Sequence, residues 1–135
     1  AVQINRPLKI VVVCNNYDNK EDHTFTVFIN PEITKFEGEI VEDFEGCLSV
    51  RDIYGKVPRY SKVRVKAIDI NGKTFRITAE GFLARIFQHE IDHCNGIVFI
   101  DQIKDNPEAF FRLLPDGNLE QLNYEKDVKS SLILW

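Results

Sequence analysis

The sequence predicts an α+β fold in which antiparallel β-strands pack around a central helix. Two alternating segments flank Asn71-Gly72, a dipeptide typical of a β-hairpin with a type I′ turn. From Thr78, whose side chain is suited to capping a helix, the apolar period lengthens until Gly96, a glycine typical of a helix C-terminus. The apolar face of this helix of about four turns is expected to consist of Phe82, Leu83, Ile86, Phe87 and Ile91.

Short apolar runs predict further elements on either side of the hairpin. Residues 8–15 form a nearly continuous β-branched run, which is typical of a strand buried on both faces. Residues 25–33 predict a second strand that Asn30-Pro31 would end. The run 96–101 is also typical of a strand, whereas 106–114 indicates a short helix with a proline in its first turn.

Length and composition limit the class of protein. The 135 residues and the hydrophobic content of 44% fit one globular domain. The formal charge of -4 favours neither nucleic acid nor an anionic membrane as a partner, and no apolar run approaches the roughly 18 residues of a membrane span. Three cysteines without a CxxC pair indicate reduced thiols in a cytosol-like compartment.

The most informative stretch is the HExxH sequence within the predicted helix. His89 and His93 are four residues apart, so on a helix their imidazoles project only about 40° from each other and can bind one cation. Glu90 projects about 60° from His93, where it can act as a general base without being a ligand. The competing interpretation is a helix surface that carries two histidines and no metal. A catalytic metal needs a third protein ligand from elsewhere.

The residues alone leave two sources for that third ligand. In the extended zincin pattern a third histidine follows, but its position here is Phe99, which cannot ligate. Glu108 or Glu120 could ligate through a carboxylate and give a peptidase of the thermolysin kind. Cys47 would give a Cys-His-His set with an open fourth position, which suits iron(II) or zinc.

Two motifs resemble those of a known enzyme family. The sequence EGCLS at 45–49, followed by QHEIDH at 88–93, resembles two of the three signature motifs of peptide deformylase, in the family order. The third signature is a glycine-rich segment ending in A-x-Q, which only Ala1 and Gln3 match. We therefore expect residues 1–135 to form a single deformylase-like catalytic domain that lacks the family's N-terminal helix and glycine-rich segment.

The resemblance implies a reaction and a metal. The reaction is hydrolysis of the N-formyl group from the N-terminal formylmethionine of newly made polypeptides, with release of formate. Cys47, His89 and His93 would hold one divalent metal, natively iron(II), which zinc, nickel or cobalt can replace. Glu90 would take a proton from the attacking water and pass it to the departing amine.

The resemblance also implies residues around the reacting groups. The amide of Gln3 and the backbone N–H of Leu48 would stabilise the oxyanion. Ile86 and Leu48 are candidates for an apolar pocket that takes the methionine side chain, and Glu45 could hold the peptide backbone. An Arg59–Asp92 pair is a hypothesis for the support of the ligand orientation.

These expectations extend to partners and to two alternatives. The partner would be a formylated nascent peptide, with ribosome association left open, and the chain would be a monomer in the bacterial cytoplasm or in an organelle. One alternative is an HExxH metallopeptidase with a downstream carboxylate ligand. The other is a catalytically weak metal-binding relative.

Overall fold

The computed structural model describes residues 5–15, 21, 23–47 and 50–128. It divides the chain into two compact units, of which the first comprises residues 1–39 and 60–97 and the second comprises residues 40–59 and 98–135. Long strands together with a few helices confirm the predicted α+β class. None of the described helices combines the length and the apolar character that a membrane-spanning helix requires.

In the first unit, β1 (Ile10–Cys14) pairs antiparallel with the start of β2 (Phe25–Cys47). The prediction that this run is buried on both faces was wrong. Val11 and Val13 are buried, but Val12 between them is 55% exposed. β1 pairs antiparallel with β2, and an antiparallel sheet commonly has one face on the core and the other in solvent, so alternate side chains of this β-branched run are exposed.

β2 does not stop at Asn30-Pro31, as the sequence suggested, but continues to Cys47. Its pairing with β1 ends where Ile10 faces Ile29, so the missing N–H of Pro31 removes no ladder bond to β1. Asn30 adopts a φ of 48° and donates its N–H to the carbonyl of Lys9 at 2.8 Å. The dipeptide therefore marks the end of one pairing and not the end of the strand.

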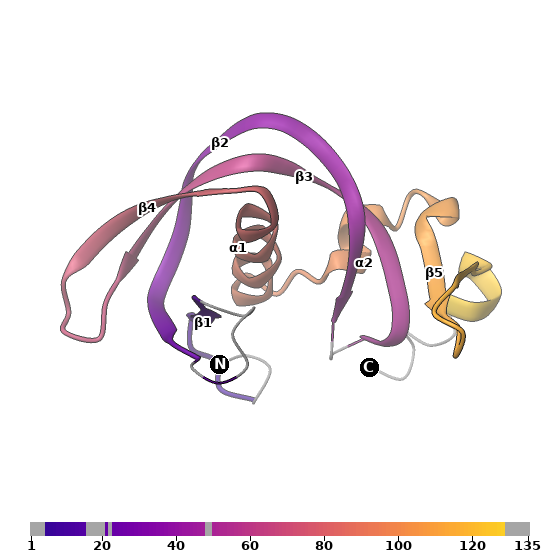
Figure 1. Ribbon diagram of the computed structural model, residues 1–135, viewed down its shortest axis with the longest axis horizontal. Helices are drawn as coiled ribbons and strands as arrows, with labels where there is room; N and C mark the ends of the chain where they lie inside the picture. The colour runs from indigo at the N-terminus through magenta and orange to yellow at the C-terminus, as the bar shows by residue number, and fades with distance from the viewer. Residues whose placement is uncertain (1–4, 16–20, 22, 48–49, 129–135) are drawn as a thin grey trace. The chain divides into compact units, whose positions relative to one another are not determined.

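β3 (Val50–Ile68) and β4 (Thr74–Glu80) form the predicted hairpin, which leads directly into α1 (Figure 1). The predicted type I′ turn was wrong, because it needs a positive φ at both Asn71 and Gly72 and only Gly72 has one. The carboxylate of Asp69 accepts the N–H of Asn71 at 2.9 Å and so stabilises a longer turn.

Helix α1 (Gly81–Cys94) begins three residues later than Thr78, which pairs with Arg64 in the β3–β4 ladder. Gly81 has a φ of 61°, a conformation that glycine adopts without a steric cost, and it lets the strand turn sharply into the helix. The buried core face consists of Ala84, Phe87 and Ile91, whereas the predicted core residues Phe82 and Leu83 are exposed.

The predicted end of α1 at Gly96 is confirmed. Gly96 has a φ of 77° and donates its N–H to the carbonyl of His93, and Ile97 donates to the carbonyl of Asp92. These two bonds form a Schellman motif, which satisfies carbonyl groups that the helix itself leaves open. The last turn of α1, which carries His93, is therefore fixed by its own cap.

The core of the first unit lies between α1 and the strands. Phe87 is 1% exposed and packs edge-on against Phe28 of β2, with ring centroids 4.8 Å apart. Burying one such side chain contributes roughly 1.5–3 kcal/mol. The other buried members of this cluster are Val11, Val13, Val63, Val65, Ala67, Ala79, Ala84 and Ile91.

The second unit contains a separate apolar cluster. β5 (Phe110–Leu113) pairs antiparallel with β3 and with β6 (Leu119–Gln121). The predicted strand at 96–101 was wrong, because α2 (Phe99–Ile103) forms there and buries three apolar side chains at helical spacing. The predicted helix at 106–114 is a 3₁₀ turn, Pro107–Ala109, followed by β5. A π-helical turn, Tyr124–Val128, ends the described chain.

Candidate metal centre

His89 and His93 lie on the face of α1 opposite its core face. Positions 89 and 93 project about 160° from Ile91, which packs into the core of the first unit. The two rings are nevertheless 8% and 7% exposed, with centroids 4.5 Å apart and an interplanar angle of 63°. Two adjacent buried imidazoles on one helix face are suited to share one cation.

Glu90 lies beside this pair. Its Oε2 is 3.4 Å from Nδ1 of His93. Burial raises the pKa of Glu90, but a hydrogen bond and positive charge from His93 and the charge of His89 outweigh burial and leave that pKa below its ordinary value. Glu90 is therefore an ionised carboxylate at neutral pH, able to accept a proton.

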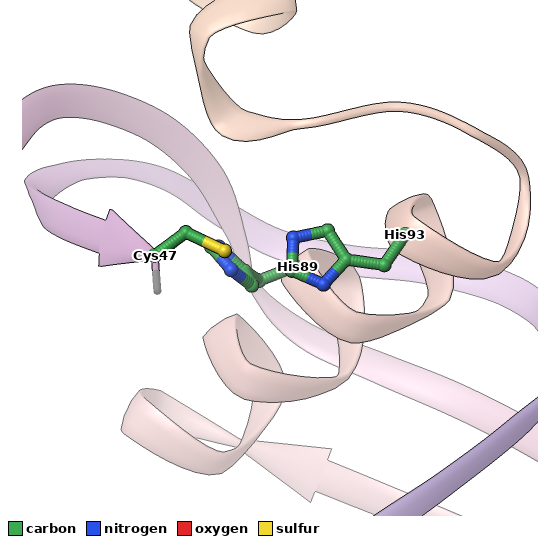
Figure 2. A group of neighbouring side chains, drawn as sticks. All are labelled: Cys47, His89 and His93. Carbon is green, nitrogen blue, oxygen red and sulfur yellow. The ribbon is translucent and has the colours of Figure 1, made fainter. Parts of the chain in front are cut away.

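The third member of the group is Cys47, at the end of β2. The ligand atoms of Cys47, His89 and His93 all lie within 4.8 Å of one another, and Figure 2 shows the sulfur beside the imidazole rings. Zinc binds at about 2.3 Å from a thiolate and about 2.1 Å from an imidazole nitrogen, so small side-chain rotations bring these atoms to one ion. A thiolate with two imidazoles fits a transition metal with an open position.

Cys94, which directly follows His93, is not part of this group. Its side chain packs against the core of the first unit. Burial raises the pKa of its thiol, and a protonated thiol is a poor ligand.

A buried ion pair stands next to Cys47 in the second unit. Arg59 donates from Nε and from a terminal nitrogen to the two carboxylate oxygens of Glu45, both at 3.0 Å. The two side chains are 6% and 5% exposed. The proposed contact of Glu45 with substrate and the proposed Arg59–Asp92 pair stay predictions, and the ion pair indicates that Glu45 supports the strand of Cys47.

A second polar interaction, which the sequence did not reveal, involves Gln88. Its amide is 4% exposed and bonds both backbone groups of Tyr60 on β3. The only local signal was a glutamine at the border of the apolar helix face, and that signal does not identify a partner on another element.

Ile86 lines a cavity of about 320 Å³ in the first unit, and its place in a pocket for the methionine side chain stays a prediction. Ile86 and Phe82 project from the same side of α1 as His89 and His93. The cavity is thus bordered by the helix face that carries the two imidazoles. Its other lining residues are Val13, Cys14, Asn15, Glu80 and Leu83.

Other predicted residues are not brought into this group. Gln3 and Leu48 lie outside the described residues. Glu108 on the 3₁₀ turn and Glu120 on β6 are both exposed. Within the described part of the chain, neither carboxylate belongs to the group formed with the histidines.

Comparisons with known proteins point to one family. Residues 1–108 match the model of the polypeptide deformylase family. The peptide deformylase of Halothermothrix orenii is 52% identical over 103 residues, which cover 76% of this chain and 64% of the relative. That of Thermomicrobium roseum is 44% identical over 123 residues, which cover 89% of this chain and 68% of the relative.

A solved structure is also similar. Peptide deformylase 1B of Arabidopsis thaliana, in complex with an inhibitor, superposes with a TM-score of 0.71 at 34% identity, covering 80% of this chain and 62% of that one. The chain therefore spans between 62% and 68% of the length of these three proteins.

The buried ion pair predicts a large effect of Arg59→Met. The substitution leaves the Glu45 carboxylate buried without its cation, and we expect a loss of about 3–5 kcal/mol in the free energy of unfolding, measured in urea. Arg64→Met is the matched control on the same strand, because its ion pair with Glu37 has a 53% exposed arginine and should contribute little. Equal losses in the two variants would contradict a structural role for Arg59.

Proposed function

Because the chain belongs to the peptide deformylase family, we propose that it hydrolyses the N-formyl group of formylmethionyl peptides and releases formate. The observation that carries this proposal is the group of Cys47, His89 and His93 with Glu90 beside it. We propose that residues 1–135 act together as one catalytic domain.

Cys47, His89 and His93 would hold one divalent metal. The family resemblance favours iron(II), and the same donor set accepts zinc, nickel or cobalt. Such an ion supplies Lewis-acid chemistry, which polarises a carbonyl group and makes water more acidic. The chain contributes the donor set and the burial that keeps competing solvent away from the two imidazoles.

Glu90 would move the proton. Its carboxylate accepts a proton from the water whose oxygen bonds to the formyl carbon, and it returns that proton to the nitrogen as the C–N bond breaks. The second proton of the water passes from the nascent formic acid to the released amine, so the products are formate and an N-terminal ammonium group, and atoms and charge balance without a covalent intermediate. The Gln3 amide and the Leu48 N–H would stabilise the oxyanion as donors.

The cavity beside Ile86 would bind the methionine side chain. At about 320 Å³ it falls within the range of small-ligand pockets, and its lining includes Phe82 and Leu83. An unbranched apolar side chain inserted there would place its N-terminal formyl group near the ligand face of α1. Leu48 would extend the apolar lining, and Glu45 would act at the edge of the peptide.

The remaining proposals concern partners. The substrate would be a formylated nascent peptide. The chain would act on it as a monomer, in the cytoplasm of a bacterium or in an organelle, and association with the ribosome is a further proposal.

An Arg59–Asp92 interaction would add support to the orientation of the proposed ligands.

Glu90→Gln tests the proton transfer. The amide cannot accept a proton, so we expect formate release from formyl-Met-Ala-Ser to fall about 10²–10⁴-fold while bound metal is retained. The assay uses anaerobically iron-loaded protein and measures formate and metal content together. The matched control is Glu108→Gln, an exposed glutamate of the second unit. No formate from the iron-loaded wild-type chain would refute the proposed activity.

Cys47→Ser and Glu120→Gln separate the deformylase from a peptidase with a carboxylate ligand. We expect Cys47→Ser to lose the bound metal, because a neutral hydroxyl replaces a thiolate, whereas Glu120→Gln binds one ion per chain as before. Metal per chain after dialysis is the measurement. Loss of metal in Glu120→Gln alone would favour the peptidase.

Ile86→Trp tests the methionine pocket. The indole would fill the cavity, and we expect KM for formyl-Met-Ala-Ser to rise about 10-fold or more with little change for formyl-Gly-Ala-Ser. Ile70→Trp serves as a control, because Ile70 is 75% exposed on the hairpin. An unchanged preference for methionine over glycine in Ile86→Trp would exclude this cavity as the binding site.

A further inference from the structure

The side chain of Gln88 fills a gap in the hydrogen bonding of β3. Strand pairing of β3 with β5 covers Tyr54 and Gly55, and its pairing with β4 begins at Lys62. Tyr60 lies between these two paired stretches. Lys62 pairs with Glu80, the last residue of β4, and the chain then continues as α1, so β4 does not reach Tyr60. Gln88, two turns into that helix, bonds the Tyr60 backbone instead.

Toward Tyr60, the Gln88 amide behaves as a residue of a neighbouring strand would. Oε1 accepts the Tyr60 N–H at 3.0 Å, and Nε2 donates to the Tyr60 carbonyl at 2.8 Å. A primary amide has the same donor and acceptor as a peptide group, so the two bonds reproduce a hydrogen-bonded pair of an antiparallel sheet. Nε2 also donates to the carbonyl of Ala84 at 3.0 Å, which ties the amide to its own helix.

The position of this amide matters because Gln88 directly precedes His89. A side-chain atom lies about 6 Å from a helix axis, so a rotation of about 10° moves it by about 1 Å. Metal-ligand distances have to hold within about 0.2 Å. The apolar contacts of Phe87 and Ile91 are non-directional, whereas the amide pair with Tyr60 is directional and part-buried.

We propose that Gln88 is a positioning residue for the metal ligands of α1, which sets the rotation of the helix against β3 through the backbone of Tyr60. The inference rests on the proposed metal site at Cys47, His89 and His93. Gln88 itself contacts neither substrate nor metal. Because Gln88 bonds the backbone of Tyr60, the proposed role of Gln88 does not depend on the Tyr60 side chain.

The test compares three variants of the full chain. Gln88→Met keeps the length of the side chain and removes the amide. Phe87→Leu disturbs the adjacent buried position on the core face without touching the amide, and Tyr60→Phe leaves the backbone partner intact. For each we would measure the dissociation constant of cobalt(II), the visible absorption bands of the cobalt protein and the melting temperature of the metal-free chain.

We expect Gln88→Met to bind cobalt about 10–100-fold more weakly, as is typical when a group that orients a ligand is lost, and to shift its absorption bands. Phe87→Leu should melt at a lower temperature and yet keep the affinity and the spectrum of the wild type. Tyr60→Phe should keep both as well. Wild-type affinity and spectrum in Gln88→Met, together with a lower melting temperature, would reduce Gln88 to a structural residue and overturn the proposal.

A second variant covers the case in which Gln88→Met does not fold. Gln88→Glu keeps the acceptor for the Tyr60 N–H and loses the donor to its carbonyl, so it should fold and bind cobalt with weaker affinity; wild-type binding there overturns the proposal. A wild-type chain that binds no cobalt overturns both this inference and the proposed function. A wild-type chain that binds cobalt but releases no formate overturns the proposed function alone.

Discussion

Two consecutive residues of β3 bind the segments that carry the proposed metal ligands. Arg59 binds Glu45 through its guanidinium group, and Glu45 is two residues before Cys47 on β2. The backbone of Tyr60 binds Gln88, which is one residue before His89 on α1. Both interactions are directional, the first buried and the second part-buried, so each restrains a rotation or a slide that apolar packing alone would permit.

The orientation of α1 shows why such restraints are needed. The helix packs its core face, with Ala84, Phe87 and Ile91, against the strands of the first unit, and its two histidines project from the other side. A rotation of the helix therefore displaces the two histidines as much as it displaces the core residues. The Schellman motif at Gly96 fixes the last turn, while the Gln88 amide fixes the turn before it. His89 and His93 stand between these two anchors.

Local patterns in the sequence predicted the hairpin, the helix, its end at Gly96 and the common helix face of the two histidines. Each of these features depends on residues close together in the chain. Features set by distant pairing were missed. β2 continues beyond Asn30-Pro31, because the proline falls where the pairing with β1 has ended and so interrupts no hydrogen bond to that strand. Thr78 does not cap the helix, because it pairs with Arg64 in the β3–β4 ladder. The third ligand was also not deducible from spacing, and the family resemblance, together with the grouping of the ligand atoms, favours Cys47.

Buried polar groups are costly to a small protein, and their distribution here is informative. In the described part of the chain, the buried polar side chains are Glu45, Arg59, Arg85, Gln88, His89 and His93. All of them lie on α1 or in the β2 and β3 segments near Cys47, and replacing such groups by apolar residues of similar size is often neutral or stabilising. Stability alone does not account for polar groups confined to the neighbourhood of three potential ligands. The Glu45–Arg59 and Gln88–Tyr60 interactions fix direction, which is what the proposed metal with an open coordination position would demand of the chain.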